Sequence, residues 1–209
     1  MPIVGKPVFD EEQRASWFSH KAEKVTPYYY SVYLADYDVT AELCPTERAA
    51  LMAFTFPKTD SAHVVIDAFD KGSYIKILPD QRKVVGFSTR NSGGVPPNFR
   101  NYFVIEFDHD FDAVLSVKDG EYKEAYEQEC NHVGAIISFK IGKRGEKVQA
   151  RVASSFISEE QAWLNIQELG QADMEQLCLQ GRTRWNEVLG KIEVEDEDID
   201  HLRTFYSCL

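Results

Sequence analysis

The sequence lacks the patterns that define several large classes of protein. Its four cysteines form no CxxC pair, which argues against a zinc site, and they are too few for a disulfide framework. No apolar run approaches the roughly 18–20 residues that cross a bilayer, and the opening MPIVGKPVFDEEQ contains no signal-peptide core. We interpret the cysteines mainly as small buried residues, with one bridge possible in an oxidising compartment: Cys44, Cys130, Cys178 and Cys208.

Basic charge is also scarce. The chain carries 23 Lys and Arg against 34 Asp and Glu, which gives a net charge of −11 over 209 residues. Binding to nucleic acid or to anionic lipid needs a positive surface, so this excess of acidic residues argues against both partners. A neutral ligand remains compatible with it.

Signatures of catalysis are missing as well. There is no GxSxG nucleophile motif, and the stretch from Arg90 to Gly94 lacks the lysine and the spacing of a phosphate-binding loop. No two of the five histidines have the spacing of metal ligands on one element. The carboxylate cluster Asp108-x-Asp110-x-Asp112 is similar to a calcium loop, but Ala113 replaces the glycine at its sixth position. We therefore interpret this cluster as a solvated turn.

What the sequence does contain is a long series of short runs rich in β-branched and aromatic residues. Turn signals such as Asp70-Lys71-Gly72-Ser73 and Asp119-Gly120 separate the runs, and no helical periodicity interrupts them before residue 157. About eleven or twelve consecutive strands predict antiparallel sheets, and this number favours a large two-sheet sandwich over a small barrel. The predicted strands are 28–34, 39–43, 49–56, 63–69, 74–78, 84–87, 102–105, 111–117, 122–128, 133–141 and 147–156.

The stretch from Val84 to Phe107 places two of these strands on either side of a polar loop, Arg90 to Arg100. Ordering such a loop costs about 1–2 kcal/mol of backbone entropy for each residue. Its arginines and amides suit sugar hydroxyls, and Phe99 can stack on the face of a sugar ring. The residues leave two interpretations open, a sugar-contacting loop and an ordered surface loop that binds nothing.

Helical signals begin at Ser158. The run Ser158-Glu159-Glu160-Gln161 has the form of a capping box, in which the serine accepts from the N–H three residues on and Gln161 reaches back. A second helix is predicted from about Asp173 to Leu189, and a third over Ile199 to Leu209 after an acidic connector. The last predicted helix has no cap or glycine at its end, which leads us to expect a fragment of a longer protein.

Several phrases, taken in order, resemble glycoside hydrolase family 92. Phe18 to Tyr29 (FSHKAEKVTPYY) is similar to the family's FSHxxExxxPGYY segment, and Ala41 to Arg48 (AELCPTER) is similar to its AELTxTxR segment. The loop leading into Tyr102-Phe103, the VASSFIS run from Val152, and Thr204-Phe205-Tyr206 resemble later markers of the family. The resemblance covers about residues 16 to 209. Two departures are Tyr28 in place of glycine and Cys44 in place of threonine.

The resemblance implies a mainly β fold, a galactose-mutarotase-like supersandwich over residues 1–157. Over 158–209 it implies linker helices and the truncated start of an (α/α)6 catalytic domain. Family members are calcium-dependent, inverting exo-α-mannosidases, so it also implies an α-1,2-type enzyme acting on glycan mannose in the periplasm or outside the cell. The general acid, the general base and the calcium ligands are expected in the remaining part of the catalytic domain. This chain alone is therefore expected to be inactive and to hold no metal.

The resemblance further implies that the chain forms one wall of the substrate pocket and stabilises the catalytic barrel. The alternatives are a free-standing carbohydrate-binding module and a mutarotase-like epimerase. Both would act without the catalytic domain as a partner. The candidate sugar-contacting residues are Arg90, Asn91, Ser92, Phe99, His20 and Glu23.

Overall fold

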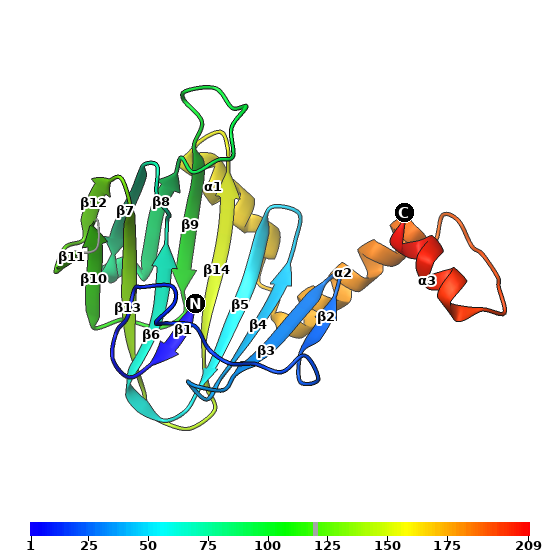
Figure 1. Ribbon diagram of the computed structural model, residues 1–209, viewed down its shortest axis with the longest axis horizontal. Coiled ribbons are helices and arrows are strands. Elements are labelled where there is room, and N and C mark those ends of the chain that lie inside the picture. The colour runs from blue at the N-terminus through cyan, green and yellow to red at the C-terminus, as the bar shows by residue number, and fades with distance from the viewer. Residues whose placement is uncertain (119–120) are drawn as a thin grey trace.

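The computed structural model describes residues 1–118 and 121–209, with the backbone alone over 113–117. Within these residues, two antiparallel sheets pack face to face and three α-helices follow them (Figure 1). This arrangement confirms the predicted sandwich. The described strands and helices are β1 (Pro2–Val4), β2 (Lys24–Thr26), β3 (Tyr29–Leu34), β4 (Val39–Pro45), β5 (Ala49–Phe56), β6 (Thr59–Asp67), β7 (Ser73–Leu78), η1 (Pro79–Gln81), β8 (Lys83–Ser88), β9 (Asn101–Phe107), β10 (Ala113–Lys118), β11 (Glu121–Lys123), β12 (Glu127–Cys130), β13 (Val133–Ile141), β14 (Glu146–Ser155), α1 (Glu159–Asn165), η2 (Ile166–Leu169), α2 (Met174–Leu189) and α3 (Ile199–Ser207).

The two sheets differ in their number of strands. In the described chain the larger sheet has nine strands, ordered β12-β7-β8-β9-β14-β5-β4-β3-β2, and the smaller has five, ordered β1-β6-β13-β10-β11. The prediction of one strand over 122–128 was wrong, because β11 pairs with β10 in the smaller sheet while β12 pairs with β7 in the larger. The prediction also missed β1 and β2, three-residue edge strands too short to show an alternating pattern. The predicted turn at Asp119-Gly120 lies outside the described residues.

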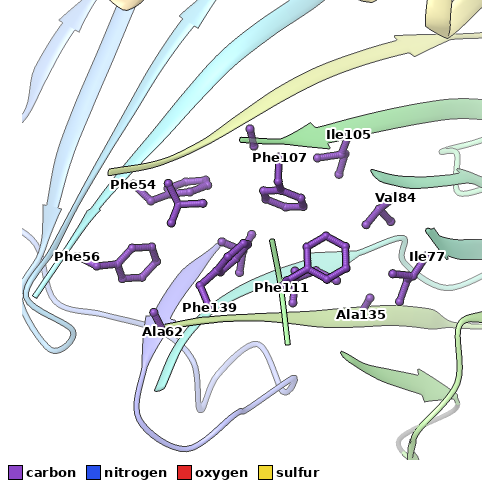
Figure 2. Packing of buried hydrophobic residues seen from close by; sticks show 14 of the residues in the cluster. Phe54, Phe56, Ala62, Ile77, Val84, Ile105, Phe107, Phe111, Ala135 and Phe139 are labelled. Atoms are coloured by element: carbon purple, nitrogen blue, oxygen red, sulfur yellow. The ribbon is translucent and has the colours of Figure 1, made fainter. Parts of the chain in front are cut away.

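Aromatic side chains build much of the core between the sheets (Figure 2). Phe54 and Phe56 come from β5, Phe107 from β9 and Phe139 from β13, and all four are almost completely buried. The rings of Phe107 and Phe139 lie 5.3 Å apart, and Phe111 packs edge-on against Phe107 at 5.9 Å. Each buried phenylalanine stabilises the fold by about 1.5–3 kcal/mol. The high phenylalanine content of the sequence therefore supplies the interior of the sandwich.

The larger sheet is buried on both faces near its centre. Val84 and Ile105 face the core between the sheets, whereas their neighbours Val85 and Val104 face the opposite side. On that side they pack with Ala162, Ile166 and Leu169 of α1 and η2 and with Leu177 of α2. Double burial explains why these strands are continuously apolar and do not alternate.

The helix caps partly follow the predicted pattern. Ser158 accepts a hydrogen bond from the N–H of Gln161 at 3.1 Å, as predicted. The reciprocal half was wrong, because the Gln161 side chain donates to Asn165 Oδ1 at 3.0 Å. A complete capping box forms instead at the start of α2, between Asp173 and Gln176. Of the described helices, none combines the length and apolar character needed to span a bilayer.

Candidate functional site

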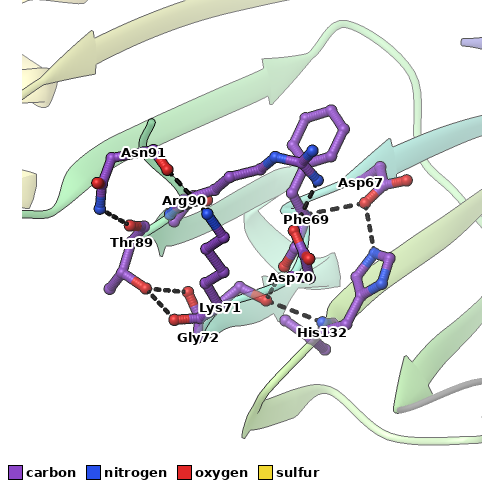
Figure 3. Close-up of polar contacts among 12 residues, drawn as sticks. Asp67, Phe69, Asp70, Lys71, Gly72, Thr89, Arg90, Asn91 and His132 are labelled. Atoms are coloured by element: carbon purple, nitrogen blue, oxygen red, sulfur yellow. Dashed lines mark hydrogen bonds and ion pairs between the residues drawn. The ribbon is translucent and has the colours of Figure 1, made fainter. Parts of the chain in front are cut away.

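The loop between β8 and β9 is anchored at its base to the turn between β6 and β7 (Figure 3). The carbonyls of Lys71 and Gly72, at 2.5 and 2.8 Å, share the single hydroxyl proton of Thr89 Oγ1, and Lys71 Nζ donates to the Asn91 carbonyl at 3.0 Å. Within the loop, the Asn91 side chain donates to the Thr89 carbonyl at 2.9 Å and accepts from the N–H of Gly93 at 2.8 Å. Asn91, one of the predicted sugar-contacting residues, therefore shapes the loop.

Arg90 is also engaged within the protein. Its Nη1 donates to Asp70 Oδ1 at 2.6 Å, and its guanidinium lies over the Phe69 ring, 5.2 Å from the ring centre (Figure 3). Phe69 has a φ of +62°, a left-handed conformation that costs a non-glycine residue about 1–2 kcal/mol. The Phe69 N–H donates to Asp67 Oδ1 at 2.9 Å and helps to hold this turn. Arg90 thus joins two loops at one end of the sandwich.

The tip of the loop, residues 92–98, is exposed throughout and includes the predicted contact residue Ser92. Behind the tip, the Phe99 ring lies 5.6 Å from the ring of Phe156, which follows β14. Phe156 and Ile157 are 70% and 77% exposed. This end of the sandwich therefore presents an exposed loop tip beside an apolar patch formed by Phe156 and Ile157.

A cavity of about 870 Å³ opens next to Arg90. Its lining includes Arg14 from the N-terminal segment, Asp67 from β6, and His132 from the turn before β13. Asp67 Oδ2 accepts from Arg14 Nη2 at 3.0 Å, and Asp67 Oδ1 lies 2.8 Å from His132 Nε2. No local pattern signals this cluster, because 53 and 65 positions separate Asp67 from its two partners.

Asp67 is held in its ionised form. Burial raises the pKa of this carboxyl, but hydrogen bonds from His132, the Phe69 N–H and Arg14 outweigh that effect and lower the pKa below its ordinary value. A general acid needs a pKa raised toward neutrality, so Asp67 is unsuited to proton donation. The cavity offers charged and aromatic groups for binding.

His20 and Glu23 lie elsewhere on the molecule. His20 Nδ1 is 2.8 Å from Glu23 Oε2, and the Tyr30 hydroxyl donates to Glu23 Oε1 at 2.6 Å. The hydrogen bonds from Tyr30 and then from His20 lower the pKa of Glu23. The edge strand β2 begins directly after Glu23, whereas the β8–β9 loop leads into β9. Four strands, β14, β5, β4 and β3, lie between β2 and β9, which corresponds to roughly 24 Å across the sheet. The structure therefore does not bring the two predicted sets of sugar-contacting residues together.

The carboxylates of the predicted solvated turn have separate partners. Asp108 Oδ1 accepts from the Gln149 N–H at 2.7 Å, and Asp112 forms an ion pair with Lys140 at 2.5 Å. Asp110 is 94% exposed. Among residues 1–118 and 121–209, no group of three or more His, Cys, Asp or Glu side chains is arranged to hold a metal ion.

A second cavity, of about 750 Å³, lies between α2 and the turn after β4. Glu168 of η2 reaches this turn, where it accepts from Thr46 Oγ1 at 2.7 Å and from Arg48 Nε at 2.5 Å. Burial raises the pKa of Glu168, but the hydrogen bonds from Thr46 and Arg48 outweigh it and lower the pKa. Glu168 therefore links the helical segment to the sandwich through an ion pair and a hydrogen bond. The sequence alone did not identify Glu168 as a residue with this role.

Comparison with known proteins assigns both segments to one family. Residues 1–155 match the N-terminal domain of glycosyl hydrolase family 92, and residues 161–209 match the catalytic domain of that family. An inverting mannosidase of family GH92 from Bacteroides thetaiotaomicron VPI-5482 is 38% identical, with a TM-score of 0.93; the match covers 100% of this chain and 28% of that one.

Two further relatives are more distant. A GH92 α-mannosidase from Bacteroides thetaiotaomicron, solved in complex with mannoimidazole, is 27% identical with a TM-score of 0.84, over 93% of this chain and 28% of that chain. An uncharacterised secreted glycosidase of Arthroderma benhamiae is 24% identical over 233 residues, which cover 99% of this chain and 30% of that protein. The chain thus spans less than a third of the length of these relatives. It belongs to glycosyl hydrolase family 92, with the family's N-terminal domain as its sandwich.

Proposed function

We propose that this chain is the non-catalytic sandwich of an inverting α-mannosidase of α-1,2 type that removes mannose from glycans. We use the term loop end for the β8–β9 loop together with Phe156 and Ile157 beside it. In this proposal the loop end forms part of the substrate pocket wall and supports the catalytic domain. The membership in family 92 carries the proposal, because the related structures include an inverting mannosidase and an α-mannosidase bound to mannoimidazole. The secreted fungal relative supports a location outside the cytoplasm.

The carboxyl groups of the chain support a non-catalytic role. An inverting glycosidase needs one carboxyl with a raised pKa as its general acid and a second carboxylate as its base. Where the described carboxyls depart clearly from their ordinary pKa, the pKa is lowered in every case. We therefore assign the general acid to the rest of the catalytic domain, outside residues 161–209. We also assign the calcium ligands to that part of the domain, since the described residues of this chain do not fit a metal site.

The loop end has the features of a surface that meets both a sugar and another domain. The loop is fixed at its base while residues 92–98 remain exposed. Beside it, Phe156 and Ile157 expose large apolar side chains, as interface residues do before their partner is bound. At the start of β9, the buried Asn101 Oδ1 has no hydrogen-bond partner within the described residues.

The proposal is tested by replacing Phe156 with serine in two settings. In this chain alone, Phe156→Ser should change the free energy of unfolding by less than about 0.5 kcal/mol, because the side chain is 70% exposed. In a longer chain that carries the complete catalytic domain, the same variant should lower mannose release from α-mannobiose about tenfold or more, as loss of a buried interface aromatic does.

The control is Val25→Ser, where the side chain is 68% exposed on the edge strand β2, five strand positions away from β9 in the same sheet. This variant should leave mannose release unchanged. Equal activity of the Phe156→Ser and unmodified enzymes would contradict the assignment of the loop end to the pocket wall and domain interface.

A further inference from the structure

Two of the four cysteines lie side by side although 134 positions separate them in the sequence. Cys44 is on β4 and is completely buried, and Cys178 is on the first half of α2 and is partly buried. Their Sγ atoms are 2.8 Å apart. Since a disulfide requires an S–S distance of about 2.05 Å, a small movement of the two side chains is enough to form the bond.

The two elements that carry these cysteines are fixed against each other. Cys44 lies opposite Leu51 in the sheet, and its Sγ donates to the Tyr28 carbonyl at 3.1 Å. On α2, Leu177 is buried in the same cluster as Cys44. One turn further along, Gly181 lies so close to Tyr28 that an added Cβ would be 2.7 Å from the Tyr28 Cβ. The proximity of the two thiols therefore follows from the packing of α2 on the sheet.

We propose that Cys44 and Cys178 form a disulfide bond that locks α2 onto the sandwich, with a small-molecule disulfide such as oxidised glutathione as the oxidant. Cys44 lies in the segment that matches the N-terminal domain, and Cys178 lies in the segment that matches the catalytic domain. The bond would therefore join the two family segments covalently. The other two cysteines would stay outside it: Cys130 donates to the His132 carbonyl at 3.1 Å, and Cys208 is exposed beyond α3.

The exchange proceeds in two balanced steps. Cys178, the less buried thiol, gives up its proton and its sulfur attacks one sulfur of glutathione disulfide, which forms a mixed disulfide and releases one glutathione thiolate that takes up the proton. Cys44 then loses its proton, and its sulfur attacks the Cys178 sulfur. The bond from Cys178 to glutathione breaks, and the second glutathione leaves with that proton. Two protein thiols are oxidised, and one glutathione disulfide is reduced to two thiols.

The environment of Cys44 sets the rate of the second step. In the reduced protein, burial and then the contact with the Cys178 thiol raise the pKa of the Cys44 thiol to about 12. In the mixed disulfide Cys178 no longer carries a thiol, and burial alone keeps the pKa of Cys44 above its ordinary value. The thiolate is the attacking species, so its low population at neutral pH makes ring closure slow. Closure should accelerate as the pH rises from 7 toward 9. The protein can therefore be prepared in its reduced form and oxidised under control.

The test is oxidation of this chain by oxidised glutathione, followed by alkylation, mass spectrometry and peptide mapping. The expected product has lost two hydrogens, has two free thiols in place of four, and yields one cross-linked peptide pair that contains Cys44 and Cys178. Reduction of this product should lower its Tm by about 10 °C, because the bond constrains a long loop of the unfolded chain. Free Cys44 and Cys178 after oxidation, or an unchanged Tm on reduction, would overturn the proposal.

Two sets of variants separate the disulfide from other effects. The Cys130→Ser/Cys208→Ser variant should form the same cross-link with the same shift in Tm. Cys178→Ser, which changes the partly buried member, should remain folded and should show no Tm difference between oxidising and reducing conditions. A cross-link that disappears in the Cys130→Ser/Cys208→Ser variant would also overturn the assignment.

Discussion

The pair of Arg14 and Asp67 is unusual among the charged residues of this protein. The two side chains are 9% and 12% exposed, whereas the ion pair of Arg90 with Asp70 is about half exposed on both sides. An exposed pair contributes about 0–1 kcal/mol, but breaking a buried pair leaves a charge without compensation and costs about 3–5 kcal/mol. The Arg14–Asp67 pair therefore holds the N-terminal segment against the end of β6.

Asp67→Asn should lower the free energy of unfolding by about 3 kcal/mol at pH 7, because Arg14 stays buried without its counter-charge. Urea unfolding followed by circular dichroism measures the change. The matched control is Asp110→Asn, where the side chain is 94% exposed and the change should stay within about 0.5 kcal/mol. Similar effects of the two substitutions would show that the buried pair contributes little.

The pH dependence of the same variant follows from the pKa of Asp67. Its folded-state pKa is lowered, while the unfolded value is about 3.9. The stabilisation by ionised Asp67 is therefore complete above about pH 5 and is lost as the pH falls through the folded pKa. The difference between the unmodified protein and Asp67→Asn should shrink as the pH is lowered from 5 to 2. A difference that stays constant over this range would exclude ionisation of Asp67 as its source.

At the scale of elements, the docking of α2 rests on a close approach at Gly181. Glycine within a helix usually costs about 1 kcal/mol relative to alanine, so Gly181→Ala would stabilise a free helix. Here the added Cβ would lie 2.7 Å from the Tyr28 Cβ, and the helix or the turn between β2 and β3 that carries Tyr28 would have to move. Gly181→Ala should instead destabilise the chain by about 1–3 kcal/mol in urea unfolding.

The control for this substitution is Thr183→Ala, an exposed position in the same helix. It should stabilise the chain by about 0.5 kcal/mol through helix propensity alone. If Gly181→Ala stabilised the chain as much as its propensity predicts, α2 would not be packed against Tyr28.

Most of the longer strands and helices were predictable because each has a local signal, whereas the three-residue edge strands β1 and β2 have none. The alternating run of β5 and the apolar run of β13 gave correct bounds, and Asp173 and Leu189 bracket α2. The predictions failed where contacts with distant parts of the chain determine the local structure. Residues 122–128 look like one strand, yet their two halves pair with strands of different sheets. Gln161 could complete the predicted capping box, but the nearby Asn165 side chain accepts its hydrogen bond instead.

At the scale of the whole molecule, the candidate site was less predictable than the fold. The β8–β9 loop was visible as a polar break between two apolar runs, but the sequence could not show that Arg90 and Asn91 are engaged within the protein. It also could not show that Phe156 lies against Phe99 or that Arg14, Asp67 and His132 meet around one cavity. These groups are far apart in the chain. The pairing of β9 with β14 in the larger sheet brings Phe99 to Phe156, and the pairing of β6 with β13 in the smaller sheet brings Asp67 to His132.

The division of labour between domains is most directly tested by an assay of mannose release. This chain alone, and a longer chain that carries the complete catalytic domain, are incubated with α-mannobiose in calcium-containing buffer, and the released mannose is quantified. We expect no release above the buffer blank from this chain and calcium-dependent release from the longer one. Calcium-dependent release of mannose by this chain alone would contradict this expectation.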